Sequence, residues 1–218
     1  MTALRHALER REDDHGFSLV ELLVGISILA IVGTIVTSTM IITMQTGQSV
    51  ENTAASTSSV RTAEARVLSM LRSAVPPSSS STANPPAIIA GADYGIRFYS
   101  QHGRHPSSPA LQVLIYVDPD GRLIERVTTP SGSGPDWTYS STNSTERIIA
   151  TGLTDRSIFS YYDQVAPSST PMTLSGQLTA AQRETVVSVR VEMSLDADDN
   201  PRTGPVTISS RIELRNLT

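Results

Sequence analysis

The chain lacks cysteine and lysine altogether, and each absence narrows what the protein can be. Without cysteine, its 218 residues can form neither disulfides nor thiolate metal sites. All 17 basic residues are arginine, and they are scattered along the sequence among 21 acids. Because nucleic-acid binding needs a basic patch that neutralises phosphates, we expect no direct nucleic-acid contact.

Proline is absent from residues 17–75, and charged side chains are absent from residues 22–50. As a helix, residues 22–50 would extend about 44 Å, whereas a bilayer core needs only about 20 apolar residues. The sequence therefore predicts one membrane span. Three arginines precede the span and none occurs at 45–60. Because basic residues near a span favour the cytoplasmic side, we expect a cytoplasmic N-terminus and an extracytoplasmic C-terminal domain.

After the span, the spacing of apolar residues indicates a helix with one solvent-exposed face. The polar and charged residues of 56–75 fall between apolar ones that recur every three or four positions, which is an amphipathic pattern. The prolines of 76–86 should end this helix. We expect the apolar face to be buried, and its residues are Val60, Ala63, Val67, Leu71 and Ala74.

The rest of the chain changes to a period of two, which is typical of strands with one buried face. The final pair of alternating runs, 187–195 and 206–214, flanks a polar turn and predicts an antiparallel hairpin. Residues 130–145 are expected to form a loop. The expected fold class is α+β, with the long helix packed on an antiparallel β-sheet domain. The other predicted strands are 95–101, 110–118, 122–128, 147–150 and 157–163.

The segment HGFSLVELLVGISILAIVGTIV (15–36) places a single acid, Glu21, at the start of the apolar run. A plain signal anchor would leave this acid without a role. Ser18 and Glu21 have the S-x-x-E spacing of a helix-capping box, and an acid suits the positive end of a helix dipole. A cleaved secretory signal fits poorly, because the apolar run is too long and the leader has four acids against three arginines.

Residues 16–33, GFSLVELLVGISILAIVG, resemble the N-terminal processing signature of type IV pilins and type II secretion pseudopilins. The resemblance implies that prepilin peptidase cuts between Gly16 and Phe17 and N-methylates Phe17. It also implies that Glu21 neutralises the new terminal ammonium of a neighbouring subunit in a filament. A charge costs roughly 2.5–3.5 kcal/mol or more at the centre of a membrane helix, so this pairing would set axial register. The acidic leader and the lack of a mid-helix proline depart from the usual family pattern.

The expected organisation is a leader at 1–16, a membrane and filament-core helix at 17–46, an amphipathic half at 47–75 and a β-rich domain at 76–218. Partners implied by the resemblance are prepilin peptidase, other pilin or pseudopilin subunits, a membrane assembly platform, and membrane lipid before assembly. Residues 157–163 and the final hairpin are similar to the C-terminal region of minor pseudopilins and minor pilins. We therefore expect a minor structural subunit, not an enzyme. The alternative is an anchored binding or adhesion protein that is never processed.

One segment is a candidate for calcium binding. Asp196, Asp198 and Asn200 alternate in DADDNPRTG, as oxygen ligands do in calcium loops. Pro201 and Thr207 stand where an EF-hand has glycine and an acid, so we favour a plain polar turn and keep calcium as the alternative. No other cofactor is expected.

Two histidines, His102 and His105, lie in the polar segment SQHGRHPSSP. The segment offers no evident further metal ligands, so we expect solvated loop histidines. The sequence contains no nucleophile-elbow or phosphate-loop pattern and no expected catalytic residues.

Overall fold

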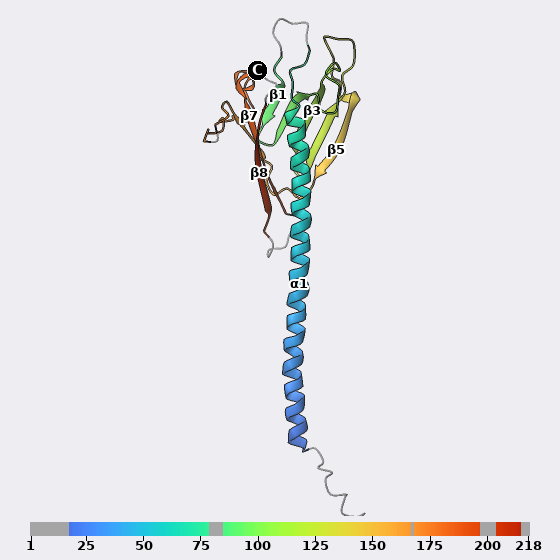
Figure 1. The fold of residues 1–218 in the computed structure, drawn as a ribbon, viewed down its shortest axis with the longest axis vertical. Helices are drawn as coiled ribbons and strands as arrows, with labels where there is room; N and C mark the ends of the chain where they lie inside the picture. The colour runs from blue at the N-terminus through green and yellow to red at the C-terminus, as the bar shows by residue number, and fades with distance from the viewer. Residues whose placement is uncertain (1–17, 79–84, 167, 197–203, 215–218) are drawn as a thin grey trace, which may run out of the picture. The chain divides into compact units, whose positions relative to one another are not determined.

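A computed structural model describes residues 18–78, 85–166, 168–196 and 204–214. The chain divides into two compact units, one ending at Gln48 and one beginning at Ser49. Within the described ranges, the elements are a long helix, antiparallel sheets of five and three strands, a short helix and a 3-10 turn (Figure 1). The predicted α+β class is therefore confirmed.

Helix α1 (Leu19–Arg72) is a continuous helix of 54 residues. All five residues predicted for its buried face are at most 2% exposed. The helix ends just before the prolines: the amides of Ser73 and Ala74 donate to carbonyls three residues back. The next amide, that of Val75, donates to Tyr99 of the neighbouring sheet. The end of α1 is thus tied to a strand by its backbone.

The five-stranded sheet keeps its strands in chain order, each antiparallel to the next. Short connections explain the β1–β2 and β3–β4 pairs, because a tight turn returns the chain beside the strand it has just left, whereas longer loops join β2 to β3 and β4 to β5. At one such turn, the Asp118 carboxylate accepts from the amides of Asp120 and Arg122, and Gly121 has a φ of 70°. The strands are β1 (Ile88–Ala92), β2 (Gly95–Ser100), β3 (Leu111–Val117), β4 (Leu123–Thr128) and β5 (Ser144–Ala150).

Two details of this sheet differ from the sequence prediction. β1 was not predicted, because IIAGA contains three small residues and little alternation. β5 begins at Ser144, inside the expected loop. Its first three residues, 144–146, are polar, but they pair with β4 and so extend the strand. The remainder of that loop contains a bridge between Ser131 and Thr138 and the 3-10 turn η1 (Ser141–Asn143).

The three-stranded sheet contains β6 (Phe159–Tyr162), β7 (Ser188–Leu195) and β8 (Val206–Glu213), in that order. The predicted hairpin is confirmed by the antiparallel register of β7 and β8. The alternation of 187–195 predicts Ser188 on the solvent-exposed face, opposite Val189 and Val191, but the structure buries it at 1% exposure. Helix α2 (Ala180–Thr185), which was not predicted, precedes β7 and has a capping box of Thr179 and Gln182.

One hydrophobic core joins the C-terminal part of α1 to both sheets. In Figure 1, β3 and β5 lie on one side of this part of α1, and β7 and β8 lie on the other. Tyr161 is fully buried in this core, and its hydroxyl donates to the carbonyls of Ala92 and Gly95. Burial raises the pKa of Tyr161 far above its ordinary value. The five-stranded sheet and β6 are therefore joined by both apolar packing and hydrogen bonds.

Candidate functional site

The structure places Glu21 in the first turn of α1, where its side chain is exposed. The turn is closed by the amide of Leu22, which donates to the carbonyl of Ser18 over 3.1 Å. A carboxylate in this position interacts favourably with the unpaired amides at the start of a helix. Gly16 and Phe17, the predicted cleavage site, lie outside the described residues.

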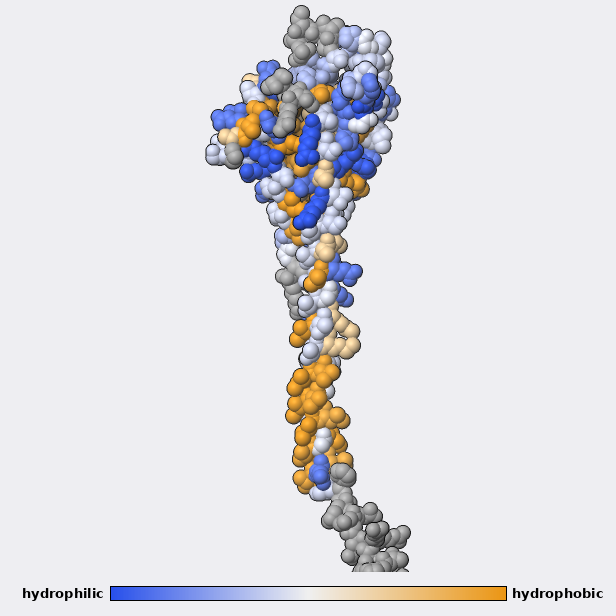
Figure 2. Space-filling view, in the orientation of Figure 1, coloured by the Kyte–Doolittle hydropathy of each residue, from blue (hydrophilic) through white to orange (hydrophobic). Residues whose placement is uncertain are grey.

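The part of α1 that follows Glu21 exposes large apolar side chains in nearly every turn up to Met44. Figure 2 shows those on one face. It is long and apolar enough to cross a membrane, and it is the one such helix among the described residues. Its hydroxyls do not present unpaired donors, because each donates to a carbonyl one turn earlier. Backbone acceptors thus satisfy Ser27, Thr34, Thr37, Ser38, Thr39, Thr43 and Thr46.

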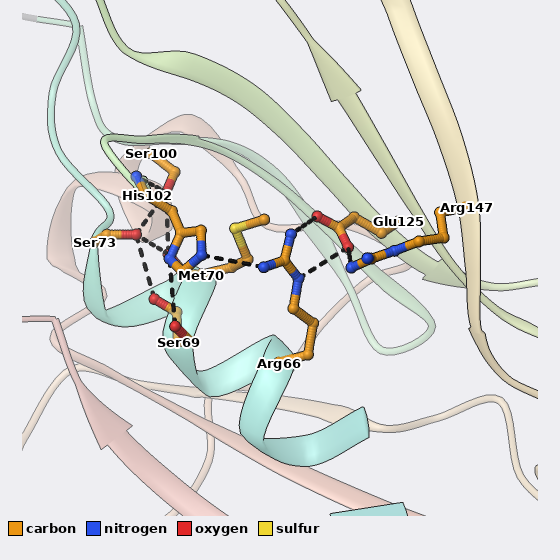
Figure 3. Close-up of polar contacts among 8 residues, drawn as sticks. All are labelled: Arg66, Ser69, Met70, Ser73, Ser100, His102, Glu125 and Arg147. Atoms are coloured by element: carbon orange, nitrogen blue, oxygen red, sulfur yellow. Dashed lines mark hydrogen bonds and ion pairs between the residues drawn. The ribbon is translucent and has the colours of Figure 1, made fainter. Parts of the chain in front are cut away.

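A second group of polar residues joins α1 to the five-stranded sheet (Figure 3). Arg66 of α1 donates to both carboxylate oxygens of Glu125 on β4, over 3.1 and 2.8 Å. Arg147 of β5 donates to the same carboxylate over 2.7 Å. The Glu125 side chain is 2% exposed. Burial raises the pKa of Glu125, but the hydrogen bonds and charges of Arg66 and Arg147 outweigh burial and leave it below its usual value.

His102 completes this ion cluster and corrects the expectation of a solvated loop histidine. Its Nε2 lies 3.1 Å from Nη1 of Arg66, and its Nδ1 lies 3.3 Å from the hydroxyl of Ser69. Because arginine can only donate, Nε2 must accept, which assigns a neutral ring protonated at Nδ1. The ring is half-buried. His105, in contrast, is exposed as predicted.

This arrangement is suited to holding elements together and poorly suited to catalysis. A general base must accept a proton from the nucleophile, but the only acceptor nitrogen of His102 faces Arg66 and not Ser69. Next to the ring, the hydroxyl of Ser100 donates to the carbonyl of Met70 and accepts from the amide of His102. These bonds connect the last turns of α1 to the end of β2.

The calcium candidates are only partly described. Asp196 directly follows β7, and its amide donates to the carbonyl of Gly152 over 3.0 Å. Gly152 has a φ of 80° and approaches the Asp196 carbonyl closely. Asp198 and Asn200 lie outside the described residues. No group of three or more acids or histidines in the described ranges could hold a metal, and calcium binding stays a prediction.

Comparison with protein families distinguishes the N-terminal segment from the rest of the chain. Residues 13–37 match the family model of the prokaryotic N-terminal methylation motif. The chain carries this methylation motif. The match includes Gly16, Phe17 and Glu21 and extends into the apolar part of α1. It is consistent with the type IV pilin and pseudopilin signature, and the motif together with the apolar helix indicates membrane anchoring.

No curated protein matches the chain. The methylation motif ends at residue 37 and does not include the β-rich part of the chain. What that part does must therefore be argued from its own structure. The sequence alone did not predict the ion cluster of Arg66, Glu125 and Arg147. A signal was present: Glu125 lies between Leu123 and Val127 on the core-facing side of a predicted strand. A buried acid requires a partner, although the sequence does not say which arginine supplies it.

Proposed function

We propose that the protein is a prepilin-like structural subunit. Prepilin peptidase would cleave it between Gly16 and Phe17 and N-methylate Phe17. The product would then assemble into a type IV pilus or type II secretion pseudopilus as a minor component. The observation that carries this proposal is the methylation motif at 13–37, which includes the exposed apolar start of α1.

Before assembly, the apolar helix would store the subunit in the cell membrane, with the N-terminus in the cytoplasm and the β-rich domain outside. Paired backbone groups and self-satisfied hydroxyls make such a segment compatible with lipid. The same apolar side chains would pack against other helices once the subunit leaves the membrane. The leader arginines, ahead of the span, support the orientation.

Glu21 would provide register during assembly. Cleavage creates an ammonium at Phe17, and methylation of a primary amine preserves its charge. A carboxylate and an ammonium in apolar surroundings are each costly alone and mutually stabilising in contact. The exposed position of Glu21 in the first turn of α1 leaves it accessible to a neighbouring subunit.

The alternative function is an anchored binding or adhesion protein that is never processed. Mass spectrometry of the N-terminal peptide, from protein made in its native cells, separates the two. Our proposal expects a mature chain that begins with N-methylated Phe17. A Gly16→Val variant, with a branched side chain at the cut, should keep the leader and serve as the control. Native protein that retains Met1 to Gly16 would overturn the proposal.

A further inference from the structure

The five-stranded sheet has an outer face, turned away from the core. Val113 and Ile115 of β3 point into the core and are fully buried, whereas Leu114 and Tyr116 alternate onto the outer face. The strand register places Arg97 of β2 beside Leu114, and Leu114 beside Arg126 of β4. Two guanidinium groups therefore flank an apolar side chain on this face.

Two shallow hollows adjoin along this row. The first, of about 250 Å³, has a largely apolar lining that includes Ala90, Tyr94 and Tyr116. The second, of about 320 Å³, is more polar and includes Gln112, Tyr139 and Ser141 in its lining. Both hollows are also lined by Arg97, Leu114 and Arg126. The row is therefore the shared border of an apolar hollow and a polar one.

The charged side chains that line the two hollows are opposite in sign to the net charge of the chain. The chain has a net charge of −4, yet no aspartate or glutamate is among the described residues that line either hollow. Arg126 is paired with Glu146 over 2.6 Å. Arg97 is exposed, and no described residue forms an ion pair with it. An arginine fork next to apolar and tyrosine surface is a common recognition site for carboxylates at protein interfaces.

We propose that this outer face docks a partner protein through a segment that carries a carboxylate next to an apolar side chain. The carboxylate binds the guanidinium of Arg97, and the apolar side chain enters the hollow between Tyr94 and Tyr116. The alternative ligand, a sugar polymer, would need tyrosine rings with a free face on which its sugars could stack. Here Arg156 lies over the ring of Tyr94 at 5.4 Å and Arg126 over that of Tyr116 at 6.0 Å, which favours the peptide.

The test uses the full chain in detergent micelles and a short N-acetylated peptide of alternating glutamate and leucine. Binding is measured by fluorescence anisotropy of a labelled peptide at two salt concentrations. We expect saturable binding that weakens with salt. Arg97→Gln should weaken it about tenfold, the usual scale for one charge-assisted hydrogen-bonded contact. Glu146→Gln should strengthen it, because Arg126 is then released. Arg72→Gln, an exposed arginine at the end of α1, is the matched control and should have no effect.

Several outcomes would overturn the proposal. One is equal binding by wild type and Arg97→Gln, which would place the peptide elsewhere, including on the micelle. A second is binding of a glutamine–leucine peptide as tight as that of the acidic one. A third is Arg97-dependent binding of polygalacturonate with no binding of the peptide, which would assign the face to an acidic polysaccharide. A fourth is Arg97-dependent self-association without peptide binding, which would assign it to a second copy.

Discussion

Arg66 of α1 and Glu125 of β4 form a two-point ion pair across the boundary between the helix and the sheet, with N···O distances of 3.1 and 2.8 Å (Figure 3). The carboxylate is almost fully buried, and the arginine side chain is 31% exposed. The pair therefore matters for stability mainly because removing Arg66 would leave a buried carboxylate with only one arginine to neutralise it.

Replacing this arginine should destabilise the β-rich part of the chain. Arg66→Met keeps much of the aliphatic stem but leaves Glu125 with Arg147 alone. We expect a loss of about 2–3 kcal/mol in the free energy of unfolding, below the 3–5 kcal/mol for a fully uncompensated buried charge. Urea unfolding followed by circular dichroism measures it. Arg72→Met, on an exposed position of the same helix, should change stability by less than about 0.5 kcal/mol. Equal effects of the two variants would contradict this role for Arg66.

The same carboxylate should make stability depend on pH. The pKa of Glu125 is lower in the folded protein than in the unfolded chain, so its contribution is complete above the unfolded pKa of about 4.3 and is lost as pH falls through the folded pKa. We expect the free energy of unfolding to decrease from about pH 5 downward. Glu125→Gln should reduce this slope.

Asp118 titrates in the same direction and provides a second variant. Burial raises its pKa, but hydrogen bonds from Arg122, the charge of Arg122 and the amide of Asp120 together lower it below the usual value. Asp118→Asn should therefore also reduce the slope of the free energy of unfolding against pH in the acid range. Asparagine also favours turns, so this variant should keep the fold. If neither variant changes the slope, the acid sensitivity arises from other groups.

Glu21→Gln separates the capping role of this residue from the assembly role. Glutamine is also suitable at the third position of a capping box, so the helix should form as before. It cannot neutralise a terminal ammonium, so we expect incorporation into filaments to fall at least about tenfold, the equivalent of 1.4 kcal/mol. Immunoblots of sheared filaments, compared with membranes, measure it. Glu51→Gln, another exposed acid of α1, is the control and should incorporate normally. Normal incorporation of Glu21→Gln would refute the register role.

Arg211 of β8 should organise the chain that follows β6. Its guanidinium lies 3.7 Å from the ring centroid of Tyr162 and donates to the carbonyls of Gln164 and Ala166 and to the hydroxyl of Ser169. The planar guanidinium of arginine donates to several acceptors at once, whereas the single ammonium of lysine could not reach all of them from the same position. We expect Arg211→Lys to speed amide hydrogen exchange at Ser169 and to cost about 1–2 kcal/mol. Arg190→Lys, at 5.6 Å from the same ring, is the control and should leave the exchange rate unchanged.

The sequence by itself determined the features that depend on local order along the chain. The buried stripe of Val60 to Ala74 and the β7–β8 hairpin follow from spacing, because helix and strand periods place every third or fourth, or every second, residue on one face. The uninterrupted apolar run predicts the membrane span, and residues 16–33 resemble the methylation signature by their identity and order. The turn at Asp118 also follows from its own residues, since Asp and Gly favour that geometry wherever they occur.

Only the tertiary structure decided which residues far apart in the chain meet. Glu125 receives its two arginines from α1 and β5, 59 and 22 residues away. His102 is drawn into that cluster because β2 ends beside α1, so a histidine that would be solvated in an isolated loop instead accepts from Arg66. β1 and the start of β5 form strands because a neighbouring strand supplies partners for their backbones, which outweighs their weak local preference.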